Sequence, residues 1–152
     1  MWDHSLNKQD MKRFLHILLI FALMFSACDN IYINGDLDGM WKLQKVEDCE
    51  KGNIEYPQDI YYSFQHYLTF ISKHNETEFP LRYLGNLYYD KVENTINING
   101  LRNFPNEKYV ATLNDLEQFM IFDTNTTFNI LTLDNEQLIL EYNSYRYYLI
   151  RW

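Results

Sequence analysis

The stretch Ile60–Ile71 restricts the fold more than any other part of the chain, because its side chains alternate between two sides with a period of two. Residues at this spacing point to the same side of an extended strand. One side is mainly apolar and carries Tyr62, Phe64, His66, Leu68 and Phe70. The other side carries Tyr61, Ser63, Gln65, Tyr67 and Thr69. The pattern predicts one long strand whose first set of side chains faces a protein interior.

The composition indicates an all-β protein of modest size. Aromatic residues make up 17% of the 152 residues, with 13 Tyr and 10 Phe, and aromatic side chains favour strands over helices. A chain of this length can form one domain and a short targeting segment. The formal net charge of −8 argues against a nucleic-acid partner, because phosphate recognition needs clustered Lys and Arg side chains.

Two further strands are predicted in the middle of the chain. Glu78–Tyr89 is the longer one, and Gly85 lies where such a strand can bend. Thr95–Ile98 is the other, and Asn99-Gly100 after it is a turn signal. The segment Leu101–Thr112 has no clear periodicity and indicates a long loop.

The C-terminal part of the chain predicts three compact strands joined by short turns, at 126–133, 137–142 and 145–152. The segment Asn114–Glu117 before them has the capping pattern of a short helix, although Phe119–Phe122 fits a strand equally well. Short turns impose up-and-down antiparallel pairing, and closure removes exposed sheet edges. We therefore predict an antiparallel β-barrel of about eight strands, with one short helix before the last three.

The N-terminal segment has the pattern of a bacterial lipoprotein signal. Lys12 and Arg13 precede the apolar run Phe14–Met24, which is too short for a stable transmembrane span. The sequence Phe25-Ser26-Ala27-Cys28 resembles a lipobox, which implies cleavage before the cysteine and acylation of that cysteine. The alternative is an ordinary cleaved signal followed by a free or disulfide-bonded Cys28.

This interpretation divides the chain into a signal peptide at 1–27, a lipidated tether at 28–34 and a barrel domain at 35–152. Met11 is an alternative start, because the residues before it do not belong to the signal pattern. Several acyl chains on Cys28 would hold the protein at the outer membrane, facing the periplasm or the cell surface. Cys49 would then be a lone thiol, and we expect it to be buried or unreactive rather than reactive or joined to another molecule.

A glycine and a tryptophan two residues apart, Gly39 and Trp41, open the first strand of the domain. Gly39 permits a tight turn, and the indole of Trp41 can plug one end of a closed sheet. The pair resembles the Gly-x-Trp motif of the lipocalin superfamily, and Gly35–Val46 is similar to lipocalin-like lipoproteins of unknown function from Bacteroidetes. The resemblance implies that Arg151, or else Arg146, stacks on the indole in a structural role.

The sequence contains no clear catalytic or metal-binding pattern. His66 and His74, the two histidines after Cys28, lack the spacing of metal ligands. Asp36 and Asp38 lack the further carboxylates of a calcium loop, so we expect them to be turn and capping residues. We find no nucleophile elbow or phosphate loop. We therefore expect no enzymatic activity, no cofactor and no metal, and convergence of ionisable groups in one pocket would reverse that expectation.

Two binding functions are consistent with such a barrel. In the first, a small apolar molecule occupies the interior against the candidate residues Tyr62, Phe64, His66, Leu68 and Phe70. In the second, the barrel is a scaffold whose outward tyrosines bind an envelope protein or a glycan. Those rings come from adjacent pairs that place one ring on each face of a strand: Tyr61-Tyr62, Tyr88-Tyr89 and Tyr147-Tyr148.

Overall fold

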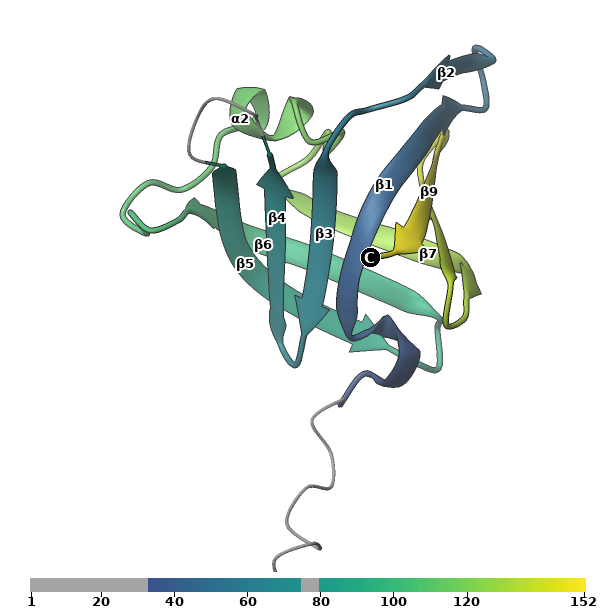
Figure 1. Cartoon of the computed structure of the whole chain (residues 1–152), viewed down its shortest axis with the longest axis horizontal. Coiled ribbons are helices and arrows are strands. Elements are labelled where there is room, and N and C mark those ends of the chain that lie inside the picture. Colours follow the sequence, from purple (N-terminus) through teal and green to yellow (C-terminus); the bar gives the residue numbers. More distant parts are fainter. Residues whose placement is uncertain (1–32, 75–79) are drawn as a thin grey trace, which may run out of the picture. The chain divides into compact units, whose positions relative to one another are not determined.

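The sheet of this protein closes on itself (Figure 1). The computed structural model describes residues 33–74 and 80–152, so the expected signal peptide and Cys28 lie outside the described residues. In the described part, the strands follow the order β2-β1-β3-β4-β5-β6-β7-β8-β9, and a further pairing of β1 with β9 closes the ring. Every pairing is antiparallel.

The barrel consists of β1 and β3 to β9, and β2 is an extra strand that pairs only with the end of β1. The bounds are η2 (Gly35–Leu37, a 3-10 helix), β1 (Gly39–Asp48), β2 (Asn53–Glu55), β3 (Ile60–Gln65), β4 (Leu68–Lys73), β5 (Leu81–Asp90), β6 (Thr95–Asn103), α2 (Leu113–Glu117), β7 (Asn125–Leu133), β8 (Gln137–Tyr142) and β9 (Tyr145–Arg151). The predicted all-β, up-and-down barrel with one short helix before its last three strands is confirmed.

The interior of the barrel is an apolar core built from alternate residues of the strands. Along β7, Thr126, Phe128 and Ile130 are buried, whereas the residues between them are exposed. Five of the largest fully buried side chains come from four strands around the ring: Trp41, Tyr62, Phe64, Phe128 and Tyr147. An eight-stranded barrel has an interior of about the size that such side chains fill.

The segment 60–71 forms two strands, so the prediction of one long strand is wrong. β3 ends at Gln65, and β4 begins at Leu68 directly opposite it. His66 and Tyr67 form the turn, where His66 takes a φ of +56°. Because neither turn residue is Gly, Asn or Asp, the sequence carries no hairpin signal at this position.

This turn removes three of the five candidate cavity residues from the interior. Phe64 pairs with Thr69, so the buried face continues through Thr69 and Ile71. The three residues that the alternation placed wrongly are His66, Leu68 and Phe70. The first two are exposed, and the Phe70 ring packs outside against Phe104, with 5.2 Å between centroids. Tyr62 and Phe64 are inside as expected.

The predicted turn at Asn99-Gly100 is also wrong, because both residues lie within β6. Gly100 has a φ of +62° at an irregularity in the pairing with β5. On the facing strand, a Cβ at Gly85 would come 2.8 Å from the backbone oxygen of Asn99. The two glycines allow a bulge where the strands bend around the barrel, as expected for Gly85. The expected loop at Leu101–Thr112 is correspondingly shorter.

The short helix α2 is present as expected, but it begins one residue before Asn114, so the predicted cap at Asn114 is wrong. Thr112 is its N-cap and forms a capping box with Asp115, in which each side chain accepts a hydrogen bond from the other residue's backbone. After the helix, Phe119–Phe122 does not form a strand. Within residues 33–74 and 80–152, no helix is long and apolar enough to cross a membrane.

Candidate functional site

The barrel end next to η2 is closed by an indole and a guanidinium. Trp41 is fully buried, and its Nε1 donates a hydrogen bond to the backbone oxygen of Leu37 at 3.0 Å. The Cζ atom of Arg151 lies 4.2 Å from the centroid of the indole. Trp41 and Arg151 are also direct partners in the β1–β9 pairing. The expected contact between Arg151 and Trp41 is therefore confirmed.

The guanidinium of Arg151 also links three segments of backbone. Its Nη1 donates to the oxygen of Asp38 at 2.8 Å, its Nε donates to the oxygen of Asn135 at 3.0 Å, and its Nη2 donates to the oxygen of Asp36. Arg146, the alternative partner of the indole, instead pairs with Glu141 at 2.9 Å. The Arg151 contacts tie β9, the β7–β8 turn and η2 together at the closed end.

Asp38 fixes the entry of the chain into the domain. Its carboxylate accepts hydrogen bonds from the backbone N–H of Asn34 at 3.0 Å and from the side-chain amide of Asn34 at 2.7 Å. It also accepts one from the backbone N–H of His66 at 3.3 Å. The expected role of Asp38 as a capping and turn residue is confirmed.

The opposite end, the mouth of the barrel, is filled by the segment 113–122, which we call the plug. Leu116, Phe119 and Ile121 of the plug are buried in the core. The ring of Phe119 packs edge-on against Tyr83, with 5.5 Å between centroids. An open depression of about 440 Å³ lies beside the plug and is bordered in part by Tyr83 and Asp115.

Two tyrosines on the inner wall of the barrel hold the plug. Tyr62 Oη donates to the backbone oxygen of Phe119 at 2.7 Å, and Tyr147 Oη donates to that of Met120 at 2.8 Å. Met120 has a φ of +63°, and the consecutive carbonyl groups of residues 119 and 120 face the two tyrosine hydroxyls. Burial raises the pKa of Tyr62 and of Tyr147, so both hydroxyls stay neutral donors.

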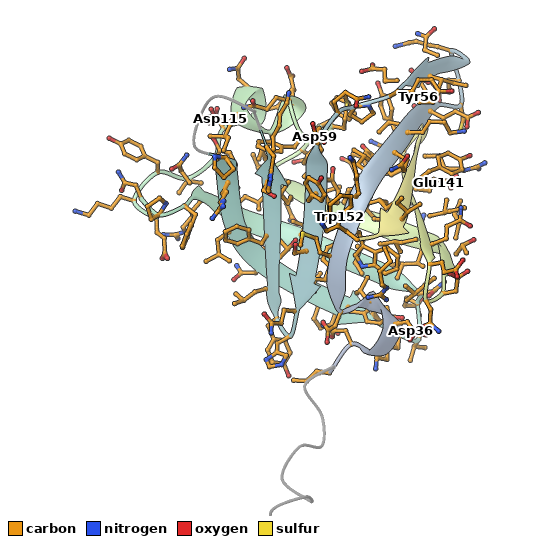
Figure 2. The ribbon with its side chains drawn as sticks, in the orientation of Figure 1. Asp36, Tyr56, Asp59, Asp115, Glu141 and Trp152 are labelled. Carbon is orange, nitrogen blue, oxygen red and sulfur yellow. The ribbon has the colours of Figure 1, made fainter. Side chains whose placement is uncertain are left out.

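The outer wall carries an aromatic and charged group of residues that we call the Trp152 cluster: Lys42, Asp59, Tyr61, His74 and Trp152. The Tyr61 ring lies 4.9 Å from His74 and 5.3 Å from Trp152 between centroids. Lys42 Nζ lies 5.2 Å from the Trp152 ring centroid and 3.1 Å from Asp59 Oδ1. Figure 2 shows Trp152 in front of β1 and β3, with Asp59 near the start of β3.

Trp152 presents most of its surface to solvent although its backbone is fixed. Its side chain is 66% exposed, and its N–H donates to the oxygen of Met40 at 2.9 Å. Tyr61 beneath it is only 6% exposed. The hydrogen bond to Asp59 raises the pKa of Lys42, which favours the ammonium form of this side chain. Sequence reasoning missed this cluster because it depends on the register of Lys42 opposite Tyr61.

The three tyrosine pairs place one ring on each face of the sheet, as expected. The inward rings, buried or half-buried, belong to Tyr62, Tyr89 and Tyr147, and the outward rings belong to Tyr61, Tyr88 and Tyr148. The outward rings do not form one patch. Lys45 Nζ covers Tyr148 at 3.9 Å from its centroid, whereas Tyr88 is 63% exposed. Of these three outward rings, only that of Tyr88 is largely exposed.

The histidines do not converge on a common site. His66 lies in the β3–β4 turn, and His74 packs on Tyr61 in the Trp152 cluster. Across the described ranges, no group of three or more His, Cys, Asp or Glu side chains is placed to hold a metal ion.

Cys49 is not buried, so only the expectation of an unreactive thiol remains open. Its thiol is free and exposed. Cys49 directly follows β1, where its backbone N–H donates to the oxygen of Ser144 at 2.8 Å, so its position is fixed by the chain reversal rather than by apolar packing.

Acid is expected to destabilise the fold through carboxyl groups that accept local hydrogen bonds. The N–H groups of Glu136 and Gln137, at 2.8 and 2.7 Å, lower the pKa of Asp134. The hydroxyl of Thr112, at 2.7 Å, lowers the pKa of Asp115. The unfolded chain therefore binds protons on these carboxyls at higher pH than the folded chain does, and protonation favours unfolding.

The stabilisation from these carboxyls is fully present above their ordinary pKa of 3.8 and is lost as the pH falls through the lowered folded values. We expect the melting temperature to fall between about pH 5 and about pH 2. Asp134→Asn keeps the shape and an acceptor oxygen but cannot titrate, so its melting temperature should fall less steeply over this range. Identical slopes for the variant and the native protein would contradict the assignment.

Comparison with known proteins agrees with this architecture. No curated protein shows detectable similarity to the chain. A crystal structure of a lipocalin-like protein from Bacteroides uniformis is similar, with a TM-score of 0.62 and 22% identity over 78% of this chain and 100% of that one. A crystal structure of an uncharacterized protein from Bacteroides eggerthii also has a TM-score of 0.62, with 19% identity over 76% of this chain and 99% of that one.

These identities establish a shared fold and carry no information about a ligand. The sequence model of the lipocalin-like domain matches residues 23–152, which include both the Gly-x-Trp pair and Arg151. The chain therefore belongs to the lipocalin-like domain family.

Proposed function

We propose that this protein is a non-catalytic binding domain, held at the cell envelope by acylation of Cys28, that binds a neutral glycan at the Trp152 cluster. A lipocalin-like barrel supports a ligand-binding role in general. The observation that carries the proposal is the exposed indole of Trp152 beside the paired charges of Lys42 and Asp59.

The filled barrel favours a binding site on the outer surface. The plug occupies the mouth, and Trp41 with Arg151 closes the other end. Of the five residues expected to line a cavity, only Tyr62 and Phe64 face the interior, and both are packed in the core. A ligand inside the barrel would have to displace side chains that already exclude water, whereas the Trp152 cluster needs no rearrangement.

The chemistry of the cluster suits a sugar ring. The face of an indole packs well against the C–H groups of a pyranose, while a carboxylate and an ammonium group hydrogen-bond to its hydroxyls. The backbone hydrogen bond of Trp152 and the contact with Tyr61 hold the indole in place, which lowers the entropy lost on binding. The net charge of −8 disfavours anionic polymers, so the glycan should be neutral.

Substitution of Trp152 tests the proposal directly. We expect at least one neutral polysaccharide among laminarin, galactomannan, xyloglucan and dextran to retard the native protein in affinity gel electrophoresis. Trp152→Ala should weaken that binding by about tenfold or more, because it removes the stacking surface. Tyr88→Ala is the matched control, since Tyr88 is equally exposed at 63% but lies outside the cluster. Equal retardation of the native protein and Trp152→Ala would contradict the proposal.

The anchoring has its own test. Intact mass measurement of the protein extracted from the membranes of an expressing bacterium should show the chain beginning at Cys28 with added acyl mass. Cys28→Ser should leave the protein unacylated and release it into the soluble fraction. A native chain with a free thiol at Cys28 would contradict lipid anchoring and leave the glycan proposal intact.

A second candidate function is binding of a small apolar molecule in place of the plug. The observation that favours it is that the buried hydroxyls of Tyr62 and Tyr147 both bond to plug carbonyls, so a ligand with two acceptor oxygens could replace those contacts. Native mass spectrometry of the protein purified from its own host is the test. A co-purifying small molecule would support this function, and a ligand-free mass would favour the surface site.

A further inference from the structure

We infer that the closed end of the barrel rests on the bilayer, where the exposed apolar side chains of three loops contact lipid. This inference rests on the proposed acylation of Cys28. It assigns an orientation to the anchored domain and a membrane-contacting surface that the glycan site does not require.

Four exposed apolar or aromatic side chains gather at the closed end: Ile33, Tyr67, Leu68 and Val92. Their side chains are 44%, 68%, 49% and 91% exposed, respectively. Ile33 precedes η2, Tyr67 belongs to the β3–β4 turn, Leu68 begins β4 directly after it, and Val92 lies in the β5–β6 turn. Figure 1 shows η2 and these two turns at the same end of the barrel. Exposed apolar residues are ordinary when scattered, but a group at one end indicates a contact surface.

Hydrogen bonds hold the three loops together at this end. The side-chain amide of Asn34 donates to the oxygen of His66 at 2.7 Å. Lys91 Nζ donates to the oxygen of Ile33 at 3.2 Å, and the N–H of Leu87 donates to the oxygen of Tyr67 at 2.8 Å. The apolar side chains therefore project from a braced surface, so little ordering is needed when they meet a membrane.

The length of the chain before Ile33 points to the bilayer as the occupant. Cys28 precedes Ile33 by five residues, which span at most about 18 Å even when fully extended. β1 alone has 10 residues, about 30 Å along the strand, and with the roughly 40° tilt of barrel strands this reaches about 23 Å from the closed end towards the mouth. A lipid on Cys28 thus keeps the closed end near the headgroups, whereas the mouth can lie far from them.

The charges at this end favour uncharged headgroups. Carboxylates outnumber cations there: the cations are Lys91 and Arg151, and the carboxylates are Asp36, Asp38, Asp90, Glu93, Asp134 and Glu136. An anionic surface would repel this excess of carboxylates, so contact must come from apolar insertion rather than from electrostatic attraction. Tyrosine favours the interfacial region of a bilayer, and Val92 is the most exposed apolar side chain of the group.

Spin labels on the anchored protein test the orientation. The full-length acylated protein would be extracted from membranes and reconstituted in phosphatidylcholine vesicles, with Cys49→Ser removing the exposed thiol. Val92→Cys then places a label at the closed end, and Ile54→Cys on β2, which is 46% exposed, places a control label at the mouth. We expect collisions with a water-soluble nickel complex to fall several-fold at position 92 on reconstitution and to stay unchanged at position 54.

Three outcomes would overturn the inference, and they are distinguishable. If intact mass shows acyl chains on Cys28 but the label at 92 stays as accessible to nickel as the label at 54, the orientation is wrong and the anchor stands. If Cys28 is unmodified, the anchor itself fails and the orientation fails with it. Partial protection of both labels would indicate a domain lying on its side, which also contradicts contact through the closed end.

Discussion

Gly39→Ala is expected to lower the free energy of unfolding by about 3 kcal/mol, because the position combines a backbone strain with a steric overlap. Gly39 has a φ of +138°, which side-chain-bearing residues rarely adopt. A Cβ at this position would overlap Nη1 of Arg151. That guanidinium cannot withdraw freely, because it stacks on Trp41 and donates to three backbone oxygens. Urea unfolding followed by tryptophan fluorescence measures the loss.

Two comparisons separate strain from overlap. Gly52→Ala is a matched control, since Gly52 also has a positive φ of +71° but a Cβ there would meet no other atom within 4 Å. Its cost should be about 1 kcal/mol. In a double-mutant cycle, Arg151→Ala should reduce the cost of Gly39→Ala, because the overlapping group is gone. Additive losses in the double variant would show that the guanidinium is not what excludes a side chain at Gly39.

Phe119→Ala is expected to lower the free energy of unfolding by about 3 to 5 kcal/mol, the range for removing a buried aromatic ring. Phe119 is fully buried in the mouth of the barrel and packs against Tyr83. The hydrogen bond from Tyr62 goes to the backbone oxygen of residue 119, so the substitution removes ring packing and leaves that bond available. Urea unfolding again gives the magnitude.

Phe104→Ala is the control for the plug, since Phe104 is 37% exposed and packs on the outer wall. Its cost should stay below about 1 kcal/mol. The space left by Phe119→Ala is expected to take up benzene, which would raise the melting temperature of that variant and not of the native protein. If Phe119→Ala is as stable as Phe104→Ala, the plug does not fill the mouth in the way the structure indicates.

The filled interior has a consequence for how this barrel can function. A lipocalin-like fold is commonly associated with a central ligand, but here the plug and the indole–guanidinium pair seal the two ends. Fold alone does not assign function, which depends on the groups that a particular chain presents. In this chain the Trp152 cluster on the outer wall is one such group of exposed side chains, and it carries the proposed binding site.

Local signals and one motif were enough to predict several parts of the fold from the amino-acid sequence. The three last strands follow from alternation and short turns, and they form within one or two residues of the predicted bounds. The short helix α2 was predicted at the right place, although its cap is formed by Thr112 and Asp115 and not by the predicted Asn114 and Glu117. The resemblance to lipocalins paired Arg151 with Trp41, residues that are far apart in the chain but adjacent once β9 joins β1.

The positions of the candidate site residues, by contrast, depend on how the strands pair. The turn at His66 and Tyr67 carries no local signal and is imposed by pairing between β3 and β4. The alternation that holds along β3 therefore does not extend into β4, where the side chains predicted to face inward face outward. The Trp152 cluster could not be predicted for the same reason, because its members come from β1, β3 and residue 152 and meet only through the register of the strands. Periodicity reports the direction of a side chain within one strand, whereas a site is set by which strands lie next to each other.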